Sequence, residues 1–212
     1  MIPIRSLEQL AAHVRALGAQ TRIAVAAAED SHTLLSIARA VGEGFIQGIL
    51  LGDRQRIETV CAAEGIDVSS FQIVDVPGHA AATAEAVRMV RAGEADVLMK
   101  GLVGTDKFLK AVLHKDKGLL PPKAVMSHVC VVELPRYHKL LFLSDTAVLP
   151  TPDLDHKIAM LNYSVAMARR FGIEKPKVAL ISGTEKVIGA LPNTLEYALI
   201  SKMAQRGQIK NC

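Results

Sequence analysis

The feature that most constrains this chain is a regular alternation of short apolar runs with segments of helical periodicity, joined by short turns. Short apolar runs are typical of buried strands, and apolar residues three and four positions apart are typical of helices that cover them. Strands are predicted at 22–28, 46–51, 71–76 and 96–100, and helices at 7–17, 34–41, 53–64, 80–91 and 106–113. Parallel strands require such crossover helices, so the alternation predicts a mainly parallel α/β sheet covered on both faces.

The composition fits that fold and argues against several classes of function. Half of the 212 residues are hydrophobic, only 4% are aromatic and tryptophan is absent, so the core must be aliphatic and rich in alanine. The net charge of +4 is spread along the chain without a basic run. Nucleic-acid binding would need a basic stripe or an aromatic platform, and the sequence contains neither.

The cysteines and the N-terminal residues favour a cytoplasmic protein without metal. Cys61, Cys130 and Cys212 are an odd set with no Cys-x-x-Cys spacing, so neither a disulfide framework nor a zinc site is expected. No set of His, Asp and Glu has metal-ligand spacing, and we predict no metal. The first residues lack the apolar core of a signal peptide, and no apolar run is long enough to span a membrane.

The alternation is interrupted after residue 118. Two apolar runs at 125–134 and 140–143 are close enough in sequence to form an antiparallel hairpin. Pro150 and Pro152 then mark the predicted boundary between a first α/β domain, 1–149, and a partial second α/β domain, 150–212. In the second domain we expect a helix at 154–171, a strand at 177–182 and a helix at 192–206. The strand would need neighbours, which favours an oligomer or a piece of a longer protein.

The stretch from Asp96 to Leu113 combines a strand, a glycine-containing turn and a helix start, with Lys100 at the strand end. Thr105 or Asp106 is the predicted N-cap. The free N–H groups of a helix N-terminus and a nearby lysine favour an anion such as phosphate, although a plain turn with solvated lysines fits the same pattern. Ligands of parallel sheets bind at the carboxyl ends of the strands, where Lys100 lies. The phosphate loop of nucleotide hydrolases is absent.

Five ordered segments resemble one family of enzymes. They are Lys100-Gly-Leu-Val-Gly-Thr-Asp-Lys-Phe-Leu-Lys110, Lys117-Gly-Leu-Leu-Pro-Pro, Ser127-His128-Val, Tyr137-His-Lys-Leu-Leu-Phe and Asp155-His-Lys-Ile-Ala-Met-Leu-Asn162. Together they resemble the phosphate acetyl/butyryl transferase family, and its butyryltransferase branch in particular. The resemblance extends over nearly the whole chain.

This resemblance implies a three-layer, mainly parallel sheet of the isocitrate/isopropylmalate dehydrogenase-like type. The family fold has two subdomains with a cleft, and the second would be incomplete here. Gly207-Gln208-Ile209 resembles the stretch that leads into the family's Asp-Gly-Pro-Leu strand, but the sequence stops at Cys212. The family's later serine, arginine and aspartate have no counterpart. We therefore expect either a fragment or a natural short form, working as a homodimer or higher homo-oligomer.

The implied reaction converts acyl-CoA, butyryl-CoA by its branch, and inorganic phosphate into acyl phosphate and CoA by direct transfer. Coenzyme A is a substrate, and no bound cofactor is expected. The resemblance assigns phosphate or CoA binding to Lys100, Gly101, Gly104, Thr105 and Ser127, and catalytic roles to Lys110, His128 and Asp145.

Each of these assignments has a structural alternative. Lys110 fits a solvated helix lysine, His128 a structural histidine and Asp145 a loop anchor. Glu29-Asp30-Ser31 at an earlier strand end fits a helix cap, whereas the resemblance implies that this turn faces the cleft, without a catalytic role. A Ser127–His128 hydrolase pair is rejected, because adjacent strand residues point to opposite faces. Three other functions stay open: a non-catalytic domain that binds CoA or acyl phosphate, an acetyl-specific transferase, and a decarboxylating dehydrogenase, against which the missing acidic metal ligands argue.

Overall fold

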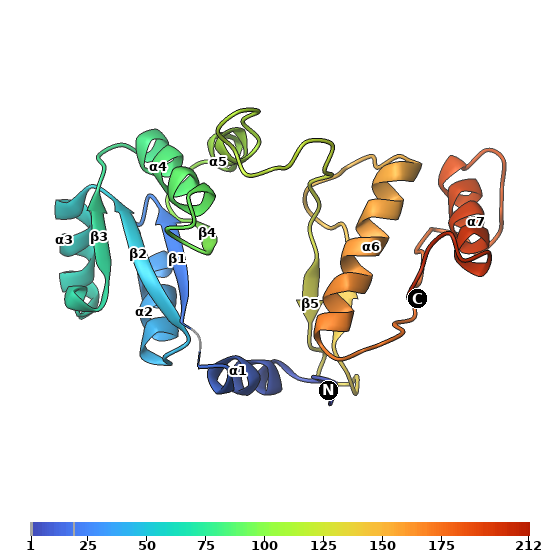
Figure 1. Ribbon diagram of the computed structural model, residues 1–212, viewed down its shortest axis with the longest axis horizontal. Coiled ribbons are helices and arrows are strands. Elements are labelled where there is room, and N and C mark those ends of the chain that lie inside the picture. Colours follow the sequence, from blue (N-terminus) through green and yellow to red (C-terminus); the bar gives the residue numbers. More distant parts are fainter. Residues whose placement is uncertain (1, 19) are drawn as a thin grey trace. The chain divides into compact units, whose positions relative to one another are not determined.

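A four-stranded parallel sheet forms the centre of residues 12–124 in the computed structural model, which describes residues 2–18 and 20–212 (Figure 1). The strand order is β3-β2-β1-β4, and all three pairs are parallel. The strands are β1 (Thr21–Ala26), β2 (Ile46–Gly52), β3 (Gln72–Asp75) and β4 (Val97–Lys100). The helices between and after them are α2 (Ser31–Gly42), α3 (Arg54–Glu64), the short 3₁₀ helix η1 (Val68–Ser70), α4 (His79–Arg91) and α5 (Thr105–Val112).

The two faces of the sheet are covered by different helices, as the predicted α/β class requires. Ala24 and Ala26 of β1 pack with α4 residues such as Ala86, in a cluster of small side chains. Val25, which points to the opposite face, packs with Leu34 of α2 and with residues of α3. Alternate residues of a strand face opposite sides, so β1 serves both layers. The parallel sheet with helices on both faces and the alanine-rich core are thus confirmed.

The second compact unit comprises the residues up to Ala11 and those from Val125 to Cys212. Its elements are the beginning of α1 (Leu7–Ala16), the antiparallel pair β5 (Cys130–Val132) and β6 (Leu141–Leu143), α6 (Leu154–Arg170) and α7 (Pro192–Gln205). Ser6 caps α1, with its Oγ accepting a hydrogen bond from the amide of Gln9 at 3.1 Å. The antiparallel pair β5–β6 confirms the hairpin predicted from the apolar runs at 125–134 and 140–143.

The division between the compact units differs from the boundary predicted at residues 149 and 150. The chain divides between Ala124 and Val125, and the hairpin lies with the C-terminal residues. The reason is packing: Leu140 and Phe142 of the hairpin contact Phe171 at the end of α6, and Ile4 joins the same cluster. Pro150 and Pro152 indicated a turn between domains, but apolar contacts between the residues on either side of them place both sides in one compact unit.

The strand predicted at 177–182 is wrong. These residues are irregular, although Leu180 packs on the cluster formed by α6 and α7. In the described part of the second unit, the only strands are β5 and β6, which pair with each other. A strand needs a neighbour to satisfy its backbone N–H and C=O groups, so a β-prone run without one stays irregular.

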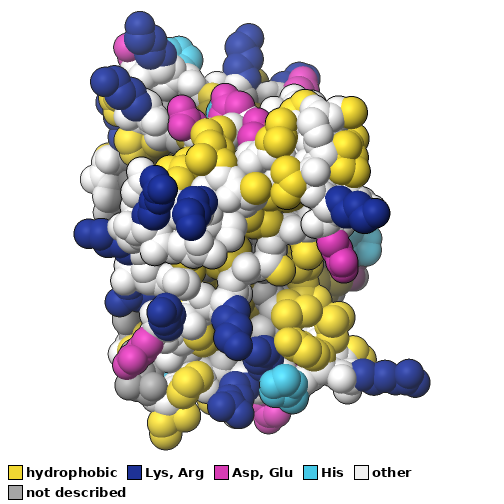
Figure 2. Space-filling view, turned by 90° about the vertical axis from the view of Figure 1, so that its right-hand side faces the viewer, with side chains coloured by type: hydrophobic (Ala, Val, Ile, Leu, Met, Phe, Trp, Pro, Cys, Tyr) yellow, Lys and Arg dark blue, Asp and Glu magenta, His cyan; other side chains and the backbone are white. Residues whose placement is uncertain are grey.

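Helix α7 packs on one face and leaves apolar side chains exposed on another. Ile200 is buried against Leu161 and Val165 of α6, whereas Leu195 and Leu199 are 47% and 48% exposed. Figure 2, which views the side on which α7 lies in Figure 1, shows hydrophobic side chains at the surface. None of the helices in the described ranges combines the length and the apolar character needed to cross a membrane.

Candidate functional site

The turn between β4 and α5 carries the predicted phosphate-binding residues. The Nζ of Lys100 donates hydrogen bonds to the carbonyl oxygens of Val103, at 3.0 Å, and Gly101, at 3.3 Å. An ammonium group has three donors. The charge of Lys100 is therefore held over the turn that leads into α5, with one N–H left for a ligand.

Gly101 is required by the close approach of two backbone segments. Its amide donates to the carbonyl of Ala26, and the next amide, of Leu102, donates to that of Ala27. A Cβ on Gly101 would be in hard contact with the carbonyl oxygen of Ala27 and 2.8 Å from that of Ala26. This glycine therefore serves the junction of β4 with the end of β1. At Gly104 a Cβ would meet only the carboxylate of Asp106, at 2.6 Å.

The N-cap of α5 is Gly104, so the prediction of Thr105 or Asp106 is wrong by one or two residues. No side chain caps this helix. Among the described residues, none accepts a hydrogen bond from the amides of Thr105, Asp106 or Lys107. Such amides carry the positive end of the helix dipole and favour an anion. A Thr or Asp N-cap would have occupied one of these amides with its side chain, so the glycine cap leaves more donors for an anion than predicted.

Of the other helices that start at this edge of the sheet, two have a side-chain cap and one does not. Asp30 caps α2 by accepting from the amide of Thr33 at 2.9 Å, and Asp53 caps α3 by accepting from that of Arg56 at 3.1 Å. Helix α4 begins after Gly78 and, like α5, has no side-chain cap. Helices α4 and α5 pack against each other. The two uncapped N-termini therefore belong to neighbouring helices.

Lys110 lies in the last turn of α5 and is exposed. It lies five positions after Thr105, which corresponds to about 7.5 Å along the helix axis. Helical side chains lean toward the N-terminus, so its ammonium group extends from Lys110 in the direction of the start of α5. A lysine in the last turn also interacts favourably with the helix dipole. Both the proposed and the plain interpretation of Lys110 therefore fit.

Glu29 lies at this edge of the sheet but does not belong to the helix cap that the pattern Glu29-Asp30-Ser31 fits. Asp30 alone caps α2, whereas the Glu29 side chain points inward and is only 2% exposed. It accepts a hydrogen bond from the amide of Asp53 at 3.0 Å and contacts Arg56 and His79. The sequence signal that could have indicated this position is an acidic residue directly after the buried alanines at the end of β1.

The remaining predicted residues form a second hydrogen-bonded cluster, in the other compact unit. The Oδ2 of Asp145 accepts from the hydroxyl of Ser127 at 2.9 Å and the amide of His128 at 3.0 Å. Its Oδ1 accepts from the amides of Ala147 and Val148, both at 2.8 Å. The His128 ring contacts Thr146 Oγ1 at 3.0 Å. Ser127 and His128 therefore share Asp145 as a partner and do not form a nucleophile–base pair.

These contacts explain the acidity of Asp145. Partial desolvation opposes its ionisation, but the hydrogen bonds from the amides of Ala147, Val148 and His128 and from the Ser127 hydroxyl outweigh that cost. Together they hold the pKa of Asp145 well below its usual range. A carboxylate whose oxygens are both occupied and whose pKa is lowered is a weak general base. The geometry therefore favours the loop-anchor interpretation over assistance to a thiol.

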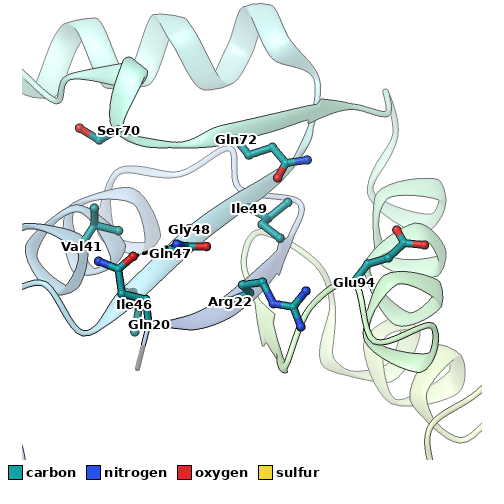
Figure 3. Close-up of a pocket in the computed structure, with 10 residues that line it drawn as sticks. All are labelled: Gln20, Arg22, Val41, Ile46, Gln47, Gly48, Ile49, Ser70, Gln72 and Glu94. Atoms are coloured by element: carbon teal, nitrogen blue, oxygen red, sulfur yellow. Dashed lines mark hydrogen bonds between the residues drawn. The ribbon is translucent and has the colours of Figure 1, made fainter. Parts of the chain in front are cut away.

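A hollow of about 460 Å³ lies at the opposite edge of the sheet, where β1, β2 and β3 begin (Figure 3). Gln47 donates to Gln20 at 2.8 Å, and Arg22 pairs with Asp96 at 2.8 Å. The hydrogen bonds from Arg22 hold the pKa of Asp96 at about 2. Because the Arg22 guanidinium is already neutralised by Asp96, and because ligands of parallel sheets bind at the carboxyl ends of the strands, we do not place the site here.

Across residues 2–18 and 20–212, no group of three or more His, Cys, Asp and Glu residues is placed to hold a metal ion.

Comparison with known proteins decides the family. The model described as phosphate acetyl/butaryl transferase matches residues 79–212, which is more than half of the chain and includes all the predicted site residues. The chain belongs to the phosphate acetyl/butaryl transferase family. The resemblance of the five sequence segments is thus confirmed.

Relatives similar to this chain include both phosphate butyryltransferases and phosphate acetyltransferases. A phosphate butyryltransferase from Clostridium acetobutylicum is 44% identical over 191 residues, or 90% of this chain and 63% of the relative. A phosphate acetyltransferase from Thermotoga maritima is 37% identical over 206 residues, or 97% of this chain and 69% of the relative. The chain therefore spans less than two thirds of the length of the Clostridium relative.

Solved structures of the family share the fold. The crystal structure of a branched-chain phosphotransacylase from Enterococcus faecalis superposes with a TM-score of 0.72 at 25% identity, over 86% of this chain and 63% of that chain. A phosphotransacetylase from Streptococcus pyogenes gives 0.73 at 17% identity, over 92% of this chain and 70% of that one. These likenesses support the α/β family fold.

Proposed function

We propose that this protein is a phosphate acyltransferase that exchanges an acyl group between coenzyme A and inorganic phosphate. The single observation that carries the proposal is the uncapped N-terminus of α5 beside the Lys100 ammonium group, in a member of this family. Three free amides, of Thr105, Asp106 and Lys107, and one charged group suit the oxygens of phosphate or acyl phosphate.

The proposed chemistry is a direct transfer. A phosphate oxygen attacks the thioester carbonyl carbon, a C–O bond forms, and the C–S bond breaks with its electron pair leaving on the CoA sulfur. In the reverse direction the thiolate attacks the acyl phosphate and phosphate leaves. Both directions place negative charge on phosphate oxygens, which the α5 amides and Lys100 stabilise. Lys110 supplies further positive charge.

We assign Asp145 a supporting role in this proposal. Its four hydrogen bonds fix the segment that carries Ser127 and His128, the other two candidates of that unit. Ser127 and His128 remain proposed substrate contacts. Homo-oligomeric assembly and a cytoplasmic location stay predictions.

The acyl chain is proposed to be butyryl, because the Clostridium acetobutylicum relative that is 44% identical to this chain is a phosphate butyryltransferase. A methylene group in an apolar pocket discriminates by only about 1–3 kcal/mol. Butyryl-CoA and acetyl-CoA should therefore be compared under the same conditions, and a higher kcat/KM for acetyl-CoA would contradict the butyryl assignment.

Lys100→Ala tests the proposal. We expect it to lower kcat/KM for phosphate in the butyryl-CoA reaction by roughly 100-fold, because a preorganised charge on the reacting group is lost. The matched control is Lys115→Ala, which removes an exposed lysine in the loop after α5 and should leave the rate unchanged. The assay follows CoA release spectroscopically.

Full activity of Lys100→Ala would contradict the assigned site. Phosphate binding by the wild-type chain without any CoA release would instead favour the alternative of a non-catalytic binding domain. Calorimetry with phosphate beside the activity assay separates these two outcomes.

A further inference from the structure

Asp106 is a carboxylate in the first turn of α5 to which the proposed reaction gives no role. It is exposed, and none of the ion pairs among the described residues includes it. Within the same part of the chain, no group donates a hydrogen bond to its oxygens. Its negative charge is therefore not balanced by a protein group described here.

The position of this carboxylate is given by its contact with the neighbouring glycine. A Cβ on Gly104, the N-cap of α5, would lie 2.6 Å from Oδ1 of Asp106. The Cβ of an N-cap residue is the root of the side chain that normally reaches the amides of the second and third helical residues. Oδ1 of Asp106 therefore lies beside the space in front of the α5 amides, where the side chain of an N-cap residue would begin.

The aspartate caps of three other helices show what Asp106 does not do. Asp30, Asp53 and Asp153 each accept a hydrogen bond from the amide three positions further along, at 2.9, 3.1 and 2.9 Å. In α5 the corresponding amide, that of Lys107, has no acceptor among the described residues. The start of α5 thus combines N–H donors with an adjacent carboxylate that leaves them available.

A carboxylate beside an anion site influences which anions bind there. An ionised aspartate only accepts hydrogen bonds, and two negative groups at one place repel each other unless they share a proton. Monohydrogen phosphate carries a P–OH group that can donate to Asp106, while its other oxygens accept from the α5 amides and Lys100. Sulfate has the same charge and a similar shape but no proton, so one of its oxygens would meet the carboxylate without a hydrogen bond.

We propose that Asp106 is a specificity residue of the phosphate site, which accepts a hydrogen bond from the P–OH group of monohydrogen phosphate and repels anions that carry no proton. This inference rests on the proposed function. The plain alternative is that Asp106 only stabilises α5, because an acidic residue in the first turn interacts favourably with the helix dipole. In that role its charge would weaken the binding of both anions alike, so a comparison of phosphate with sulfate separates the two interpretations.

The test is a pair of titrations, one with inorganic phosphate and one with sulfate. They are followed by the backbone amide NMR signals of Thr105 and Lys107, which report on the start of α5. Constant ionic strength and a slightly alkaline pH, at which both anions carry nearly two charges, leave the proton as the main difference between them. We expect the wild-type chain to bind phosphate about tenfold more tightly than sulfate, as one hydrogen bond to a charged group provides.

Asp106→Asn removes the charge and keeps the size of the side chain. Its amide group can donate to sulfate and accept from phosphate, so the preference should fall to about twofold or less, mainly because sulfate binds more tightly. Asp116→Asn, which removes an exposed carboxylate in the loop after α5, is the matched control and should keep the wild-type preference. If Asp106→Asn does not fold, Asp106→Ser, whose hydroxyl also donates and accepts, should give the same loss of preference.

Three results would overturn the inference. They are equal binding of the two anions by the wild-type chain, an unchanged preference in Asp106→Asn, and no shift of the α5 amides with phosphate. The last result would also contradict the proposed phosphate site, whereas the first two would leave that site in place. Absence of acyl transfer with the anion preferences as expected would contradict the proposed function alone.

Discussion

Gly101→Ala is expected to destabilise the protein by about 3 kcal/mol, the upper end of the usual cost of forcing an extra group into a packed site. The added Cβ would meet the carbonyl oxygens of Ala26 and Ala27, which are backbone atoms and cannot move aside independently of β1. Relief would require breaking the hydrogen bonds that join the β4–α5 turn to the end of β1. The measurement is the free energy of unfolding from denaturant titration.

Gly104→Ala is the matched control, three residues along the same turn. Its Cβ would contact only the Asp106 carboxylate, the end of a flexible side chain, and its φ of −60° suits alanine. We expect a change below about 1 kcal/mol. Equal stability of the Gly101 and Gly104 variants would show that the close approach at Gly101 is absent.

Asp145→Asn is expected to cost about 3 kcal/mol at neutral pH, because an amide cannot accept all four hydrogen bonds and turns donors toward donors. The folded state holds the pKa of Asp145 below its usual range, whereas the unfolded value is about 3.9. The stabilisation is therefore fully present above the unfolded pKa and is lost as the pH falls through that value toward the folded pKa.

The stability difference between wild type and Asp145→Asn should accordingly shrink below about pH 4. Urea titrations at several pH values measure it, with Glu174→Gln, an exposed carboxylate after α6, as the control that should track wild type. A difference that is constant or grows in acid would contradict the hydrogen-bonded state of Asp145.

The sequence predicted most of the elements because local patterns dominate them. The four strands of the parallel sheet, their connecting helices and the hairpin all follow from apolar runs and periodicity. The strand at 177–182 failed because pairing depends on a neighbouring strand, which composition does not reveal. The compact units divide at a different place from the predicted domain boundary because Phe142 packs on Phe171 across the two prolines.

The candidate site was predictable in type but not in detail. Helix starts at strand ends were visible in the sequence, and so was Lys100. The glycine N-cap of α5 was not, because Gly, Thr and Asp all suit that position. The inward orientation of Glu29 was not predicted, because a capping carboxylate and a buried one look alike in sequence. Only the contacts of its carboxylate with Asp53, Arg56 and His79 in the structure distinguish the two.

The central claim is that free amides at the start of α5 bind phosphate. A titration with inorganic phosphate, followed by backbone amide NMR, tests it most directly. The account predicts saturable shifts of the Thr105, Asp106 and Lys107 amides, and none for the Thr33 and Arg56 amides, which Asp30 and Asp53 already occupy. Unmoved α5 amides at saturating phosphate, or equal shifts at all four helix starts, would contradict it.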